Sequence, residues 1–239
     1  MILKEDDNMN IGLILAGGSG TRMGSNLPKQ FMEVHEKPLI IYTIEAFNNN
    51  PNIEYIAIIC KADYKEKLDL WVKKFEMTKV KWIIDGGDTR QSSVECGLKI
   101  LDNVCSEDDI IVIHDGARPL ISQKIISDNI EAAIKYNATN TVIPSADTII
   151  VSKDGQGIDE VPPRNELYLC QTPQSFKFGL IKKAHENAKV NNIKTVTDDC
   201  QLVLKLGEKV HLVNGDKFNF KVTTAEDFSI LRALTTSQN

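Results

Sequence analysis

The sequence has little excess charge and no long apolar run, and each absence excludes a class of protein. Its net charge at pH 7 is only −5 over 239 residues. Broad electrostatic adhesion to nucleic acid is therefore excluded, and any anion site must be local. The apolar runs are no longer than a β-strand, which excludes a membrane-spanning helix. We expect neither nucleic acid nor a membrane as a partner.

Paired cysteines and a leader-like start are also missing. The sequence has five scattered cysteines and no C-x-x-C spacing; they are Cys60, Cys96, Cys105, Cys170 and Cys200. This pattern is typical of reduced thiols and argues against a disulfide framework or a zinc site. Residues 1–10 are acidic and lack the basic flank and apolar stretch of a signal peptide. We therefore expect a cytoplasmic protein.

The chain contains a regular alternation of strand-like and helix-like segments. We predict strands over 11–15, 53–60, 80–84 and 110–113, with helices between them, the clearest over 62–76. We expect Ser122 to cap the helix that follows the strand over 110–113. After residue 177 the pattern predicts helices over about 178–190 and 198–206, strands near 209–213 and 218–222, and a last helix capped by Thr224 with Asp227. This rhythm indicates an α/β fold, a mostly parallel sheet covered on both faces within one domain of residues 1–239.

The alternation stops at about residue 144. Residues 144–171 hold short β-prone pieces, a DGQG turn and paired prolines. An insertion of this length is usually a functional or interaction element, so we predict a β-arm that leaves the main sheet. The arm has too few large apolar residues to form a core alone. The simplest cover is the same arm of a second copy, which predicts a homodimer.

The stretch 15–29, LAGGSGTRMGSNLPK, follows the first predicted strand. A dinucleotide loop would need glycine where Met23 stands, and a Walker A loop would need lysine where Ser25 stands. A dinucleotide-dependent oxidoreductase is therefore disfavoured. Several glycines after a parallel strand can turn backbone N–H groups into one concavity, and Arg22 and Lys29 add positive charge. We predict a triphosphate cradle; the alternative is a plain strand–helix turn.

Polar residues gather where predicted strands end. In an open parallel sheet, ligands bind beyond the carboxyl ends of the strands. The first strand leads into residues 17–22, the third into 86–90, and the fourth into His114, Asp115 and Arg118, while Lys221 and Thr223 belong to the late segment. Alone, Asp115 could be a helix cap and Arg118 a solvated charge. Together these groups predict an anion-binding rim.

The rim has more cations than candidate bases, and no serine elbow, Cys/His pair or zinc cluster is evident. This favours phosphoryl or nucleotidyl transfer, in which positioning and charge stabilisation supply most of the rate. A phosphate monoester is largely dianionic at neutral pH and needs no general base. We expect Arg and Lys to neutralise both anions, with Mg²⁺ or another divalent cation bridging the triphosphate oxygens.

Six motifs now allow a comparison with a known family. In order, LAGGSGTRMG…PKQF, DGGDTRQSSV, HDGARP, RNELYLCQTPQSF, TDD and FNFKVTTAEDF resemble the cytidylyltransferases of the 2-C-methyl-D-erythritol 4-phosphate and D-ribitol 5-phosphate group. The resemblance covers residues 11 to about 231. It implies a Rossmann-like nucleotidyltransferase, dimeric through the 144–171 arm, that joins CTP to a polyol phosphate and releases pyrophosphate.

The resemblance also implies residue roles. The residues expected to bind the nucleotide are Ala16, Gly17, Gly18, Ser19, Gly20, Gly87, Asp88, Ser93 and Asp115. Those expected to stabilise charge during transfer are Arg22, Lys29 and Lys221. Those expected to bind the polyol phosphate are Arg118, Thr148, Arg164 and Thr223, with Thr148 and Arg164 reaching the partner subunit's site. Asp115 also matches the acidic residue near the metal.

Several details resemble the ribitol 5-phosphate branch more closely. The loop begins LAGG, DTII lacks a following lysine, RNELY replaces D-R-x-x-L-W, and Phe218 precedes Asn219 where an acid is common in the other branch. We therefore expect CDP-ribitol as product, a precursor for teichoic acid or capsule synthesis. The alternatives are a methylerythritol 4-phosphate enzyme of isoprenoid synthesis and a nucleotide-binding protein without catalysis. Arg22, Lys29 and Lys221 argue against the last.

Overall fold

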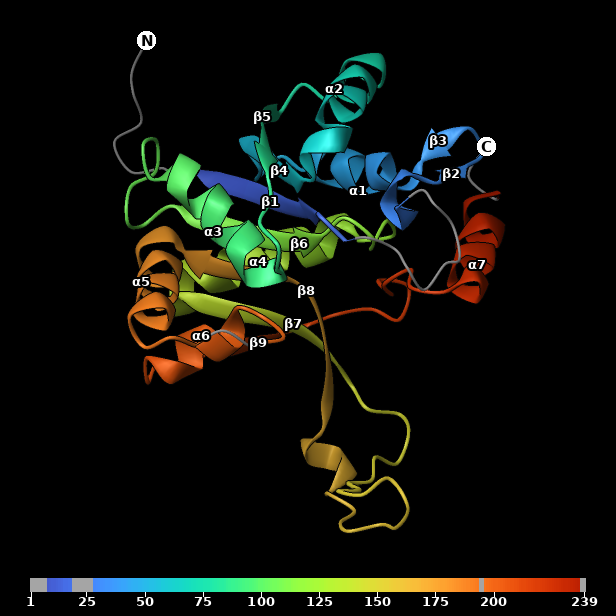
Figure 1. Cartoon of the computed structure of the whole chain (residues 1–239), viewed down its shortest axis with the longest axis vertical. Coiled ribbons are helices and arrows are strands. Elements are labelled where there is room, and N and C mark those ends of the chain that lie inside the picture. The colour runs from blue at the N-terminus through green and yellow to red at the C-terminus, as the bar shows by residue number, and fades with distance from the viewer. Residues whose placement is uncertain (1–7, 19–27, 194–195, 237–239) are drawn as a thin grey trace.

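A seven-stranded sheet runs through the centre of the chain (Figure 1). The computed structural model describes residues 8–18, 28–193 and 196–236. The strand order is β5-β4-β1-β6-β8-β7-β9. The strands are β1 (Asn10–Ala16), β4 (Tyr55–Cys60), β5 (Val80–Asp85), β6 (Ile110–Asp115), β7 (Ala138–Pro144), β8 (Tyr168–Lys177) and β9 (His211–Asn214). Only β8 runs antiparallel to its neighbours among these strands, so the predicted mostly parallel sheet is confirmed.

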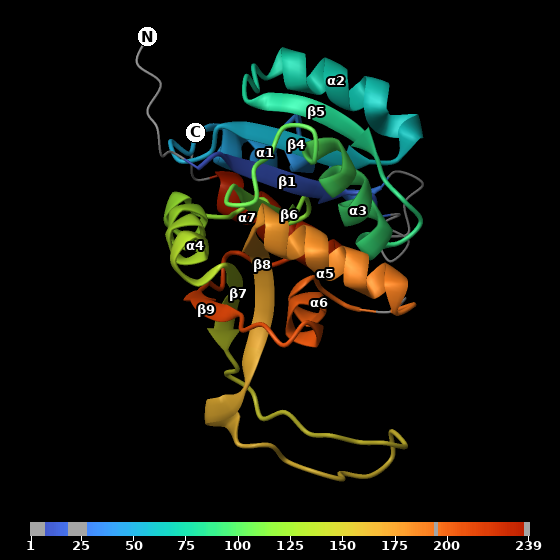
Figure 2. The same cartoon turned by 90° about the vertical axis from the view of Figure 1, so that its left-hand side faces the viewer.

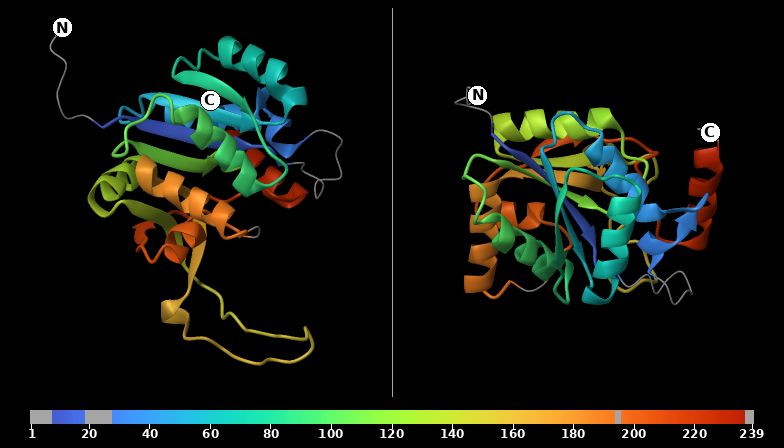
Figure 3. Two further views of the ribbon diagram at one scale, coloured as in Figure 1. Left: turned by 60° about the vertical axis from the view of Figure 1, so that its left-hand side comes forward. Right: turned by 90° about the horizontal axis from the view of Figure 1, so that it is seen from above.

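Helices cover both faces of the sheet (Figures 2 and 3). One face carries α1 (Leu39–Asn48), α2 (Lys65–Lys74) and α4 (Gln123–Tyr136). The other carries α3 (Arg90–Leu101), α5 (Phe178–Val190) and α6 (Cys200–Lys205). The remaining elements are α7 (Ala225–Thr235), the ribbon of β2 (Glu33–Val34) and β3 (Lys37–Pro38), and the 3-10 turns η2 (Lys29–Phe31), η3 (Ala62–Tyr64) and η4 (Arg164–Glu166). None of the described helices has the length and apolar composition needed to cross a bilayer.

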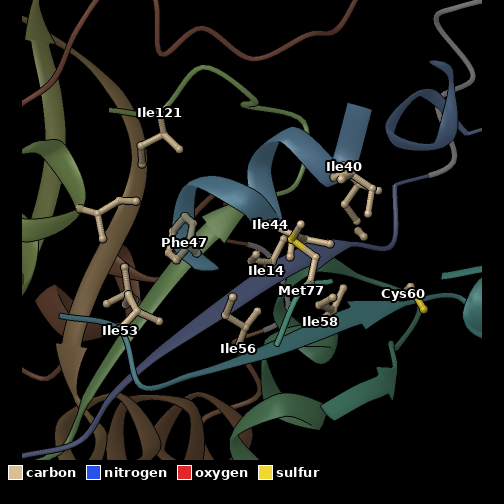
Figure 4. Packing of buried hydrophobic residues seen from close by; sticks show 14 of the residues in the cluster. Ile14, Ile40, Ile44, Phe47, Ile53, Ile56, Ile58, Cys60, Met77 and Ile121 are labelled. Carbon is tan, nitrogen blue, oxygen red and sulfur yellow. The ribbon is translucent and has the colours of Figure 1, made fainter. Parts of the chain in front are cut away.

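Each face of the sheet has its own apolar core because successive strand residues point to opposite faces. Ile14 and Ile58 pack toward α1 and Phe47, as Figure 4 shows. Their neighbours Leu13 and Ile59 pack toward α3 and α5. A slip of one residue would exchange the two sets, so burial on both faces fixes the register of β1 and β4. The register in turn fixes where these strands end.

Short polar caps fix where three helices begin. The Ser122 hydroxyl accepts a hydrogen bond from the Ile125 N–H at 3.3 Å, as predicted. Thr224 accepts from the Asp227 N–H at 3.3 Å, and the Asp227 carboxylate accepts from the Thr224 N–H at 2.9 Å. This reciprocal arrangement is the predicted capping box. Thr89 caps α3 in the same manner.

The predicted strand at 218–222 is wrong. These residues belong to no strand of the sheet. The segment is held by a hydrogen bond from the Val222 N–H to the Ala117 carbonyl, and Val222 and Phe220 pack in a small core with Leu231 of α7. Apolar residues alternate at Phe218, Phe220 and Val222 as they would in a strand. In the structure, however, Phe218 is 58% exposed and Asn219 is buried, so the sequence alternation does not correspond to a strand with one buried face. The predicted helix over 62–76 also begins as the 3-10 turn η3 and ends at Lys74.

Residues 145–167 project away from the sheet between β7 and β8 (Figures 1 and 2). Strands β7 and β8 pair up to Pro144 and Tyr168, which forms the base of the projection. Beyond this base, the only strand-like pairing described within the segment is an isolated bridge between Val151 and Glu160. The segment therefore leaves the sheet where the sequence predicts, but most of it pairs with no strand among the described residues.

Candidate active site

A cleft of about 620 Å³ lies beyond the carboxyl ends of β1, β4, β5 and β6. The strand order reverses at β1, between β4 and β6, which is where open α/β sheets bind ligands. The cleft is lined by Leu15, Gly17, Gly18, Lys29, Gln30, Lys61, Ala62, Gly86, Gly87, Asp88, Thr89, Arg90, Ser93, Asp115, Ala117, Lys221 and Thr223. The structure thus brings the three predicted clusters to one rim. The volume of the cleft is in the range of small-molecule sites.

Gln30 closes the base of the glycine-rich loop. Its side-chain amide donates hydrogen bonds to the carbonyl of Ala16 at 2.6 Å and to that of Gly18 at 2.9 Å. Gln30 is 3% exposed, so both bonds are shielded from water. They tie the end of β1 to η2, which begins with Lys29. The backbone of Gly17 and the side chain of Lys29 therefore keep a fixed relation at the cleft.

The wall after β5 is formed by a close turn into α3. A Cβ atom at Gly87 would collide with the Ser92 side chain, so a larger residue there would push the turn away from the helix. The Ser93 hydroxyl donates to the Gly87 carbonyl at 3.2 Å. The N-terminus of α3 also carries partial positive charge. This wall therefore presents backbone amides and a helix end to a ligand.

Asp115, at the end of β6, holds two cations with one oxygen. Its Oδ2 lies 3.0 Å from Lys221 Nζ and 3.4 Å from Arg118 Nε. Burial opposes ionisation of this carboxyl, but Lys221 and Arg118 hold its pKa well below the usual range. The carboxylate is therefore charged throughout the physiological pH range. It anchors two cations that would otherwise repel each other.

The neutral side chain of His114 supports the backbone around Asp115. Burial lowers the pKa of His114 to about 4. Its Nε2 lies 3.2 Å from the Arg118 carbonyl, which can only accept, so Nε2 carries the proton. The Thr172 hydroxyl then donates to Nδ1 at 3.0 Å and accepts from the Asp115 N–H at 3.1 Å. Since both ring nitrogens are engaged, His114 supports the backbone and cannot serve as a general base.

Asn219 connects the segment that carries Lys221 to β8. Its carbonyl accepts from Arg118 Nη1 at 2.8 Å. Its amide donates to the Thr172 carbonyl at 2.8 Å and to Gln171 Oε1 at 3.1 Å. These bonds position Lys221 without strand pairing, which explains how a non-strand segment can place a side chain in the cleft.

The predicted site residues fall into four groups. Those at the cleft wall are Gly17, Gly18, Lys29, Gly87, Asp88, Ser93, Asp115, Lys221 and Thr223. Ala16 and Arg118 are joined to them by the hydrogen bonds described above, and the Thr223 hydroxyl donates to Asp227 at 2.7 Å. Ser19, Gly20 and Arg22 lie outside the described residues. Thr148 and Arg164 lie on the arm, outside this cleft.

Sequence reasoning missed the residues that position others. Gln30 belongs to the PKQF motif, next to Lys29, and Thr172 belongs to the QTPQ motif. Both motifs can be recognised in the sequence. Their roles depend on hydrogen bonds to segments distant along the chain, which spacing does not reveal. Lys61, after β4, and Arg90 also line the cleft without having been assigned a role.

The arrangement suits a polyanion. The cleft lining has more cations than carboxylates. The cations are Lys29, Lys61, Arg90 and Lys221, and the carboxylates are Asp88 and Asp115. No cluster of three or more His, Cys, Asp or Glu suited to a metal occurs among the residues that the structure describes. A single carboxylate with substrate phosphates is, however, a usual way to hold Mg²⁺. The cleft can therefore bind phosphates through cations and backbone amides.

The chain matches a known protein family over most of its length. The profile of the family described as 2-C-methyl-D-erythritol 4-phosphate cytidylyltransferase (IspD) matches residues 11–237. The chain belongs to this family of cytidylyltransferases. This membership confirms the family resemblance seen in the motifs and the assignment of the chain as a nucleotidyltransferase.

Curated relatives and solved structures extend over nearly the whole chain. The chain is 38% identical over 231 residues to the ribitol-5-phosphate cytidylyltransferase of Vibrio parahaemolyticus, covering 96% of this chain and 97% of the relative. It is 35% identical to that of Streptococcus agalactiae, covering 95% of each. The 4-diphosphocytidyl-2C-methyl-D-erythritol synthase of Anaerococcus prevotii superposes with a TM-score of 0.83 at 29% identity, covering 97% of this chain and 100% of that one. This similarity confirms the Rossmann-like fold.

Replacing Gln30 by Glu should weaken CTP binding in a pH-dependent manner. A carboxylate cannot donate to the Ala16 and Gly18 carbonyls, and losing two buried hydrogen bonds should raise the KM for CTP about tenfold or more at pH 8. Burial raises a carboxyl pKa, and the protonated form can donate one bond, so the defect relative to the unmodified enzyme should shrink toward pH 5.5. Steady-state kinetics across pH measures both effects.

Two further variants complete this test. Gln30→Met has no donor at any pH, so its defect should not shrink on acidification. Gln123→Glu is the matched control, because the Gln123 amide also donates to a carbonyl, that of Ala46 at 2.8 Å, away from the cleft. An unchanged KM for CTP in both Gln30 variants would contradict the positioning role.

Proposed function

We propose that this enzyme transfers a cytidylyl group from CTP to D-ribitol 5-phosphate, giving CDP-ribitol and pyrophosphate. The observation that carries the proposal is the similarity, at 35–38% identity over almost the full chain, to relatives named ribitol-5-phosphate cytidylyltransferase. The cations gathered around Asp115 suit the reaction, because both reactants are phosphate anions. A cytoplasmic location, where CTP is present, is part of the proposal.

The proposed step is a direct displacement at the α-phosphorus of CTP. A phosphate oxygen of the polyol phosphate forms a bond to that phosphorus, and the bond to the bridging oxygen of the β-phosphate breaks. The bonding pair leaves with pyrophosphate. The attacking phosphate is largely dianionic at neutral pH, so no side chain has to remove a proton. Lys29 and Arg22 stabilise the triphosphate, while Lys221 and Arg118 receive the attacking phosphate.

A divalent cation, most simply Mg²⁺, completes the proposal. When bound, it would neutralise charge on the triphosphate oxygens. Asp115 is the residue that would hold it, because its carboxylate is ionised and lines the cleft. Both of its ion pairs use Oδ2, so Oδ1 is the oxygen we assign to the metal.

The identity of the polyol phosphate has one specific alternative. The family name and the solved structures point to 2-C-methyl-D-erythritol 4-phosphate. Ile150 in place of the lysine that commonly follows D-T-[LIV], the RNELY sequence and Phe218 before Asn219 favour ribitol 5-phosphate.

A substrate panel should separate the candidates. With CTP and Mg²⁺, kcat/KM for ribitol 5-phosphate should exceed that for methylerythritol 4-phosphate by at least about tenfold, since a site built for one set of hydroxyl groups leaves polar groups unpaired with the other. UTP should replace CTP poorly for the same reason. Pyrophosphate release measures all combinations. A preference for methylerythritol 4-phosphate would overturn the assignment, and no release with any polyol would favour a binding protein.

We also propose that the arm pairs with a second copy of the chain. Its apolar side chains are exposed: Ile158 is 66% exposed, Val161 55% and Ile150 49%. An isolated β-ribbon is marginal in water, so contact with a second arm would supply the missing cover. A two-fold axis would bring the two identical surfaces together.

Arg164 and Thr148 would then serve the partner's active site. Both are exposed, and Arg164 Nη1 makes only a 3.5 Å contact with the Ala146 carbonyl among the described residues. The alternative, a surface ion pair with Asp159 or Glu160, does not occur among the ion pairs of the described chain. A guanidinium can grip a phosphate dianion with two parallel hydrogen bonds, which suits the polyol phosphate.

Mixing two inactive variants tests the shared site. Arg164→Ala and Lys29→Ala should each lower turnover by at least about a hundredfold. After subunit exchange at equal amounts, half of the dimers are mixed and one of their two sites has both residues, so about a quarter of full activity should return. The control replaces the second protein by the Lys29→Ala/Arg164→Ala double variant, which cannot restore a site. No recovery despite exchange shown by native mass spectrometry would place Arg164 in its own subunit's site.

A further inference from the structure

A buried chain of polar side chains runs behind the wall of the cleft. Arg90, the first residue of α3, places Nη1 2.6 Å from Asp199 Oδ2. The other oxygen of Asp199 lies 3.0 Å from His185 Nε2 on α5. Asp199 is fully buried and His185 is 4% exposed. Asp199 belongs to the TDD motif, to which the reaction described above gives no role.

The anchor of this chain is tied to the central sheet. The Asp199 N–H donates to Gln174 Oε1 at 3.2 Å, and Gln174 lies on β8 opposite Ile113 of β6. The Asp199 carbonyl accepts from the N–H groups of Leu202 and Val203 in the first turn of α6. The carboxylate therefore has a fixed position, set by β8, α5 and α6.

Stability alone does not explain such an arrangement. Removing two charges from water carries a desolvation cost that often equals their attraction, and apolar residues of similar size frequently serve as well. Although burial opposes ionisation of Asp199, Arg90 and His185 hold its pKa below the ordinary value, so the charge is kept. What the pair does provide is a fixed location for one guanidinium.

That location is the side of the cleft formed by the turn 86–89 and the start of α3. Arg90 lines the cleft together with the turn 86–89 and Ser93, and its side chain remains 26% exposed. A guanidinium has five N–H donors, whereas Asp199 takes one of them.

We propose that Arg90 is a positioning residue for CTP, and that Asp199 acts through it. The pair joins the start of α3 to α6 and β8, which holds the segment 86–93 at the distance from Asp115 and the glycine loop that the nucleotide requires. The fixed guanidinium adds positive potential on that side. The TDD motif is the remote anchor of the nucleotide wall. The inference rests on the proposed use of CTP.

The test uses single and double variants of the full-length enzyme. Arg90→Met and Asp199→Asn should each raise the KM for CTP at least tenfold and leave kcat at saturating CTP within threefold, because Lys29, Arg118 and Lys221 stay in place. Arg90→Lys keeps the charge and should recover part of the loss. In the double variant, the KM should not exceed that of Arg90→Met alone, since Asp199 has nothing further to hold. The matched control applies the same substitutions to the surface ion pair of Lys177 and Asp108, whose Nζ and Oδ1 atoms lie 2.6 Å apart.

A binding measurement separates this inference from a purely structural role. The CTP-induced rise in Tm, taken relative to each variant's own Tm without ligand, should be clearly smaller in Arg90→Met and Asp199→Asn and intermediate in Arg90→Lys. A lower Tm with an unchanged CTP-induced rise and an unchanged KM would overturn the inference. If Arg90→Met does not fold, Arg90→Lys gives the decision: a KM for CTP equal to that of the unmodified enzyme would equally overturn it.

The same measurement shows whether the proposed function itself fails. If CTP does not raise the Tm of the unmodified enzyme, the use of CTP is wrong, and the inference about Arg90 falls with it. If CTP does so and the variants respond equally, only the role of Arg90 is wrong.

Discussion

The carboxylate of Asp115 is the constraint on which the site depends. A buried charge requires counter-charges, and this one has two, from Arg118 in the turn after β6 and from Lys221 just before α7. The neutral His114 and Thr172 hold the backbone behind it, and Asn219 joins the Lys221 segment to β8. One acid thus gathers Lys221 at the wall of the cleft and Arg118 behind it.

The fold and the rim were predictable because they follow from local patterns. Continuous apolar runs such as 110–113 belong to strands buried on both faces, and the ends of parallel strands share one edge of a sheet. From the sequence alone, those two rules place Gly17, Gly87 and Asp115 at one edge of the sheet, where the structure has the cleft. The caps at Ser122 and Thr224 were predictable because they depend on residues three positions apart.

The parts that were not predictable depend on contacts between distant segments. The segment 218–222 has the apolar alternation of a strand, but it is held by hydrogen bonds of Asn219 to β8 and Arg118 and by a backbone bond from Val222 to Ala117. Gln30 reads as an ordinary polar residue until its amide is found between two loop carbonyls. The pairing of Arg90 with Asp199 joins two motifs that each look complete alone. The arm's partner lies in another copy in our proposal, which a single chain does not contain.

Replacing Asp115 by Asn tests the central claim most directly. The change keeps the shape and removes the charge that gathers Lys221 and Arg118, so kcat/KM for the polyol phosphate should fall at least about a hundredfold. Asp109→Asn is the matched control, a buried carboxylate at the other end of β6 that accepts from the Met9 and Ser106 N–H groups. It should change stability more than turnover. Turnover near that of the unmodified enzyme in a folded Asp115→Asn protein would contradict the account.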